Sequence, residues 1–264
     1  MKFWPLIKIL PVRTHFRFVR LSRVFASLSV IAVIGAIFLS VYPFTPPCGG
    51  LACGIDFKGG SVLELSTAPK AIDLSKVRGS LGGMGIGDVQ VQGIGGATSA
   101  MVRFQTPTGA DANATAERVK ARLTQVLGTV RFSRAEVVGP KISSELFGKG
   151  LLGLGAAIVA MLLYIWFRFE LQFGLGAVAA LFHDVFLTFG LIAVAHIEFN
   201  LNAVAAILTI IGYSMNDTVV VFDRLRENRR KYKRMPLRDL IDLSVNETLS
   251  RTVITGLTAL LALS

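Results

Sequence analysis

Four long apolar runs constrain the fold of this chain more than any other feature of its sequence. They cover residues 24–44, 146–167, 171–195 and 201–222. A helix needs about 20 predominantly apolar residues to cross the hydrocarbon core of a bilayer, and each run has roughly that length. We therefore expect a polytopic α-helical membrane protein. The mean hydropathy of +0.59 and the charged fraction of 17% favour the same class.

Basic residues gather beside the apolar runs and predict the orientation of the chain. Segment 1–23 contains six lysine and arginine residues and no acid, and segment 223–250 contains eight between Arg224 and Arg238. The positive-inside rule places both segments in the cytoplasm, and it explains the net charge of +11 without a nucleic-acid partner. We interpret run 24–44 as an uncleaved anchor, because a signal peptide has a shorter apolar core followed by a cleavage site.

Residues 45–145 lack long apolar runs and are expected to form a water-soluble domain outside the cytoplasm. Alternating patterns predict strands at residues 61–65, 89–93, 100–105 and 129–138. Helical periodicity predicts helices at residues 74–81 and 112–127. The order βαββαβ matches the ferredoxin-like split motif, so the expected fold class is a helical membrane protein with one extracytoplasmic α+β domain. Its residues suggest a binding surface and no catalytic group.

Polar residues interrupt the fourth apolar run at Ser214, Asn216 and Asp217. An ionised aspartate at the centre of a membrane helix costs about 2.5–3.5 kcal/mol on the insertion scale, so it persists beside a partner, a proton or a wet cavity. The alternative is that Asp217 reaches toward the interface or only packs helices. Aspartate is short and reaches poorly, so we favour a functional role.

The third apolar run carries His183 and Asp184 near its centre. Ionisable side chains at this depth face the interior of a helix bundle. There they could relay protons, or they could only tie neighbouring helices together. Both interpretations stay open.

Two short stretches follow the first apolar run. Cys48 and Cys53 could close a small disulfide loop if this side is oxidising, and two cysteines are too few for a structural zinc site. Segment 54–60 contains three glycines around an acid and a base, which predicts a tight turn into a strand. We expect no metal site.

The end of the chain combines a polar and an apolar segment. Residues 237–248 predict an amphipathic helix, and a further apolar run begins near Arg251. Its residues 252–264 are too few to cross a bilayer, so we expect the fifth span to be incomplete here.

Five segments together resemble the SecD/SecF family of protein translocase subunits, within the resistance-nodulation-division superfamily. They are residues 54–60 (GIDFKGG), 137–140 (VVGP), 183–184 (HD), 210–224 (IIGYSMNDTVVVFDR) and 246–252 (NETLSRT). The family-motif positions are Gly54, Asp56, Phe57, Gly59, Gly60, Gly139 and Pro140.

The resemblance implies an organisation of six spans in the bacterial inner membrane, with a cytoplasmic N-terminus. It implies pairing with SecD, action at the SecYEG channel on unfolded polypeptides, YajC and YidC as further partners, and contact with lipid. It also implies coupling to the proton-motive force, with protons and no other cofactor. Asp217 corresponds to the proton-carrying acid, with Ser214 and Asn216 beside it, and Arg251 corresponds to an arginine of the fifth span.

Other functional classes compete with this interpretation. A proton-driven exporter of the same superfamily would share the acid but carries larger outer domains. A membrane-anchored binding module would use the outer domain without energy coupling. An ATP-driven motor is disfavoured because the sequence lacks the phosphate-binding loop pattern Gly-x-x-x-x-Gly-Lys-Ser/Thr.

Overall fold

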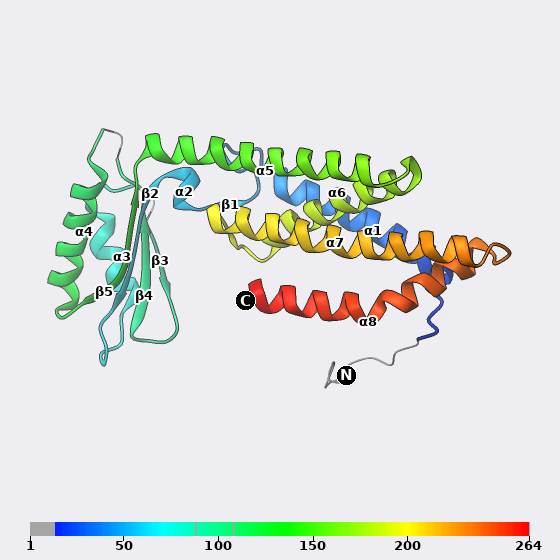
Figure 1. Cartoon of the computed structure of the whole chain (residues 1–264). Coiled ribbons are helices and arrows are strands. Elements are labelled where there is room, and N and C mark those ends of the chain that lie inside the picture. The colour runs from blue at the N-terminus through cyan, green and yellow to red at the C-terminus, as the bar shows by residue number, and fades with distance from the viewer. Residues whose placement is uncertain (1–13, 88, 108, 264) are drawn as a thin grey trace, which may run out of the picture. The chain divides into compact units, whose positions relative to one another are not determined.

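The computed structural model describes residues 14–87, 89–107 and 109–263, and the chain divides into two units (Figure 1). One unit contains residues 52–153 together with the short segment 198–201. The other contains residues 14–51, 154–197 and 202–263. Each unit is therefore built from segments that are far apart in the sequence.

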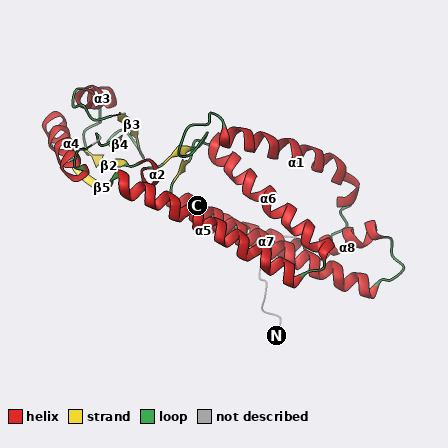
Figure 2. Ribbon diagram, turned by 90° about the horizontal axis from the view of Figure 1, so that it is seen from above, coloured by secondary structure: helices red, strands yellow, loops and turns green. Residues whose placement is uncertain are grey.

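A four-stranded antiparallel sheet forms the first unit. Its strands are β2 (Gly60–Ser66), β3 (Val89–Gly93), β4 (Ser99–Phe104) and β5 (Arg131–Val138). The strand order is β3-β4-β2-β5, with Leu63 of β2 opposite Val102 of β4 and Ala135 of β5. Helices α3 (Leu74–Gly82) and α4 (Ala112–Leu127) cover one face of the sheet (Figures 1 and 2). The elements follow the order βαββαβ that the sequence predicts.

Local sequence signals explain where these two helices begin and which face they bury. The Asp73 carboxylate accepts hydrogen bonds from the backbone N–H groups of Ser75 and Lys76, and Asp111 does the same for Ala114. Such caps satisfy N–H groups that lack a partner within the helix. The core between the sheet and the helices contains Leu63, Leu65, Val77, Leu81, Val102, Phe104, Val119 and Leu123.

Long helices form the second unit. They are α1 (Phe18–Val41), the later part of α5 (Pro140–Arg168), α6 (Leu171–Val194), most of α7 (Leu201–Lys231) and α8 (Leu237–Leu263). Among the described residues, α1, α5, α6 and α7 are long and apolar enough to cross a membrane. Helix α1 packs closely on α6, where any side chain larger than hydrogen at Gly190 would overlap Ala36. Small residues allow membrane helices to approach in this way.

The helix boundaries differ from the predicted ones where polar sequence continues a helix. Helix α1 begins at residue 18, six residues before the predicted apolar run. Helix α7 ends at residue 231 instead of at the predicted residue 222. The basic segment at residues 223–250 therefore begins as a continuation of α7, and the helix predicted at residues 237–248 is the first part of α8. Arginine, lysine and glutamate are good helix formers, so loss of apolar character does not end a helix. Helix α8 likewise runs unbroken through the predicted boundary near residue 251.

Three short elements were not predicted. Segment 54–60 is not only a turn, because residues Ile55–Lys58 form the one-turn helix α2. Residues 196–200, between the third and fourth apolar runs, contain β6 (Glu198–Phe199), which pairs in parallel with β1 (Ala52–Cys53). Two-residue strands carry no periodicity, so only their tertiary pairing reveals them.

Candidate functional site

Four polar side chains form a hydrogen-bonded chain across three apolar helices. The hydroxyl of Ser29 on α1 contacts Nε2 of His183 on α6. Nδ1 of the same imidazole lies 2.7 Å from Oδ1 of Asp184. The second carboxylate oxygen, Oδ2, accepts a hydrogen bond from the hydroxyl of Ser214 on α7. The sequence predicted three of these residues but placed them in separate groups, and it missed Ser29.

The geometry of these four hydrogen-bonded side chains suits the movement of a proton. An ionised Asp184 accepts the hydrogen of Nδ1, so that Nε2 of a neutral His183 accepts the hydrogen of the Ser29 hydroxyl. A protonated His183 instead donates at both ring nitrogens. Consecutive residues of α6 thus connect its two neighbours, with His183 facing α1 and Asp184 facing α7. The same contacts also tie the helices together.

Asp217 lies three residues beyond Ser214 on α7 and faces α8. Its Oδ1 is buried and has no hydrogen-bond partner within the described part of the chain. Arg251 and Thr255 of α8 lie near this carboxylate, and the Thr255 hydroxyl donates to the Arg251 carbonyl. The structure therefore brings Asp217 and Arg251 together. Asn216, which the sequence places beside Asp217, is exposed.

Three of the family-motif residues, Gly54, Asp56 and Phe57, lie beside the beginning of α7. The carboxylate of Asp56 accepts a hydrogen bond of 3.0 Å from the backbone N–H of Leu201 and so caps this helix. Phe57 is 4% exposed and packs on Phe147 and Phe199, at ring-centroid distances of 5.4 and 5.2 Å. The motif anchors the beginning of the helix that carries Asp217.

The motif glycines serve close backbone approaches. The backbone N–H of Gly54 donates to the carbonyl of Phe199 over 2.9 Å. Gly59 and Gly60 have φ angles of +77° and +123°, which L side chains rarely adopt. Pro140 is the first residue of α5, and the Gly139 carbonyl accepts a bond from the fourth residue. These positions have structural roles.

The remaining predicted site residues are Cys48 and Cys53, and both are disulfide-bonded in the structure. Across the described ranges, no group of three or more His, Cys, Asp or Glu side chains could hold a metal ion. The chemistry available in the helices is therefore that of carboxylates, an imidazole, a guanidinium and hydroxyls.

Apolar helices that hold carboxylates in their interior, joined to an α+β domain, define an integral membrane protein of the transport type. Residues 118–264 match the family model described as "Protein export membrane protein SecD/SecF, C-terminal". The chain belongs to this family and is of the SecF type.

Similar proteins agree with this membership. The protein translocase subunit SecF of Rhodobacter capsulatus is 45% identical, over 97% of this chain and 79% of the relative. The SecF of Rickettsia akari is 40% identical, over 99% of this chain and 83% of the relative. The crystal structure of SecDF, a translocon-associated membrane protein from Thermus thermophilus, matches with a TM-score of 0.76 and 30% identity. That match covers 96% of this chain and 34% of the SecDF chain.

Proposed function

We propose that this chain pairs with SecD and uses the proton-motive force to help pull unfolded polypeptides outward through the SecYEG channel. The observation that carries the proposal is the Asp217 carboxylate, which lies in the apolar run of α7 and near Arg251 of α8. Intramembrane carboxylates of this kind mark proton pathways in pumps and transporters. In the solved SecDF structure, the match to this chain covers 34% of the SecDF chain, whose name joins SecD and SecF. This supports SecD as the partner.

The proposed orientation places the N-terminus in the cytoplasm of a bacterium and the α+β unit, as a ferredoxin-like domain, outside the inner membrane. The basic segments beside the apolar runs support this orientation. In this arrangement the outer domain meets the emerging polypeptide, and the lipid-facing helices surround the proton path. YajC and YidC are proposed as further partners, and no nucleic acid is involved.

In the proposed mechanism, Asp217 takes up a proton and releases it as Arg251 changes its distance from the carboxylate. Charge interactions in a low-dielectric site depend strongly on distance, so such a movement links protonation to the positions of α7 and α8. Ser214, Asp184 and His183 form the adjoining relay, and Asn216 lies beside it. One proton that crosses 100 mV releases about 2.3 kcal/mol, enough to shift a two-state equilibrium more than tenfold.

The test is export of a secreted polypeptide into inverted membrane vesicles that contain the full complex, with and without a proton gradient. Asp217→Asn preserves the shape of the side chain and removes its proton exchange, so we expect insertion and assembly without gradient-stimulated export. Thr209→Val is the matched control, because the Thr209 hydroxyl bonds only to the Ala205 carbonyl of its own helix among the described residues. Equal gradient stimulation of wild type and Asp217→Asn would instead favour the binding-module function.

A further inference from the structure

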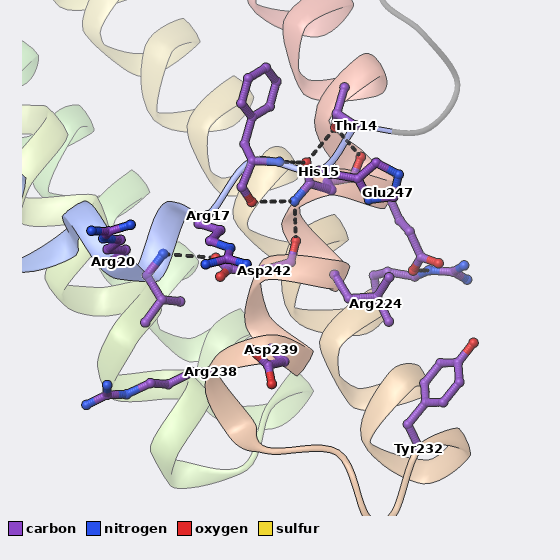
Figure 3. A pocket seen from close by; sticks show the side chains of 14 residues that line it. Thr14, His15, Arg17, Arg20, Arg224, Tyr232, Arg238, Asp239, Asp242 and Glu247 are labelled. Carbon is purple, nitrogen blue, oxygen red and sulfur yellow. Dashed lines mark hydrogen bonds and ion pairs between the residues drawn. The ribbon is translucent and has the colours of Figure 1, made fainter.

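A buried polar contact joins α7 and α8 close to the turn between them. Asn228 is 1% exposed, and its amide nitrogen donates to the Ser244 hydroxyl over 3.1 Å and to the Glu247 carboxylate over 2.7 Å. The guanidinium of Arg224 donates to the same carboxylate over 2.7 Å. Figure 3 shows Arg224 and Glu247 pointing toward each other from the two helices.

The spacing of these residues shows that the contact belongs to one continuous seam. On α7, Asp217, Arg224 and Asn228 are separated by seven and four residues, which places them on one face. On α8, Ser244, Glu247, Arg251 and Thr255 follow one another at steps of three and four residues.

The two faces run in opposite directions from the short turn at residues 232–236. Eleven residues separate Asn228 from Asp217, and eleven separate Ser244 from Thr255, about three helical turns in each case. A register that sets Asn228 opposite Ser244 therefore also sets Asp217 opposite Thr255 and the neighbouring Arg251.

We propose that Asn228 is a positioning residue that sets the register of α7 against α8 and thereby holds Arg251 beside Asp217. A buried amide needs hydrogen-bond partners, and a single buried asparagine between helices is known to fix their register. If α8 moved one turn along α7, by about 5.4 Å, Leu240 would face Asn228 in one direction and offer no side-chain partner.

The partner that Asn228 finds in the observed register is a charged one. The hydrogen bond from Arg224 holds the pKa of Glu247 below its usual range, so this carboxylate is ionised at neutral pH. A hydrogen bond to an ionised acceptor is stronger than one between neutral groups. The register is therefore held by a charge-assisted contact that lies about three turns from Asp217 along α7 and about one turn from Arg251 along α8.

The other polar contacts of α8 do not duplicate this function. Asn246 lies on a different face of α8, where its amide pairs with both the N–H and the carbonyl of Phe16, and Asp242 accepts from the Val19 N–H at the beginning of α1. These contacts join α8 to α1. Asn246 thus provides a matched control, because it is an asparagine of the partner helix α8 whose amide bonds to Phe16 and not to α7.

The test measures the distance between spin labels at Arg229 of α7 and Leu257 of α8, both exposed, in the complete complex. We expect one narrow distance in wild type and in Asn246→Leu. Asn228→Leu should broaden the distribution or shift it by about 5 Å, the length of one helical turn. The exchanged pair Asn228→Ser with Ser244→Asn retains the hydrogen bond and should restore the narrow distance.

An unchanged distance in Asn228→Leu, or no restoration by the exchanged pair, would overturn the inference. Gradient-stimulated export provides a second readout, which rests on the proposed function, and it should fall with Asn228→Leu and recover in the exchanged pair. The two ideas fail separately. Wild-type export without gradient stimulation contradicts the proposed function, whereas altered distances with normal stimulation contradict the link from Asn228 to the Asp217 pair.

Discussion

The Asp56 carboxylate accepts a hydrogen bond from the first N–H group of α7. Removing this carboxylate should therefore lower the local stability of the beginning of α7 by a measurable amount. Replacing an N-cap aspartate by alanine costs about 1 kcal/mol, and loss of the charge at the helix N-terminus removes about 0.3–1 kcal/mol. The hydrogen bond to Leu201 is exposed, so we take about 1 kcal/mol for Asp56→Ala. Asp56→Asn keeps an acceptor and should lose about half of that.

Hydrogen exchange at the beginning of α7 measures this free energy directly, because a loss of 1 kcal/mol in local stability speeds exchange about fivefold. We expect peptides that cover residues 198–206 to exchange about fivefold faster in Asp56→Ala and about twofold faster in Asp56→Asn. Asp73→Ala is the matched control, since Asp73 caps α3. It should speed exchange in α3 alone. Unchanged exchange near residue 201 in both Asp56 variants would refute the capping role.

Three further predictions concern other parts of the chain. Cys48 and Cys53 should resist alkylation in protein isolated without reductant, and two alkylated thiols in its mass spectrum would contradict this. Gly60→Ala should destabilise β2 by about 1–3 kcal/mol, because φ is +123°, and normal exchange protection of β2 would count against it. Since Arg224 lowers the pKa of Glu247, their contact should stabilise the protein fully above the ordinary glutamate pKa and lose its effect as pH falls through the lowered value. Glu247→Gln should remove that component from thermal unfolding measured against pH, and an unchanged pH dependence would contradict it.

Periodicity and capping residues made most of the α+β unit predictable. Helix α4 has the predicted bounds because Asp111 provides a cap before it and Gly128 follows its last turn. Strand β4 alternates buried and partly exposed residues, and this pattern is the signal by which a half-buried strand is recognised. Local chemistry determined these elements, so sequence alone was sufficient.

Features that depend on contacts between distant segments could not be predicted. Ser29 is an ordinary polar residue within an apolar run, and only the packing of α1 on α6 brings it to His183. The pairing of β1 with β6 joins segments about 145 residues apart and leaves no periodic trace. The contact between Asn228 and Ser244 likewise depends on the register of two helices, although their spacing is visible once one pair is known.

The central claim is that protons pass by way of Asp217, and proton flux through the complex tests it most directly. The flux can be followed with a pH-sensitive dye enclosed in proteoliposomes that contain the SecD-paired protein, after an outside pH step and during export. We expect flux in wild type and in Thr209→Val, and none above the lipid background in Asp217→Asn. Equal flux in wild type and Asp217→Asn would contradict a proton path through Asp217.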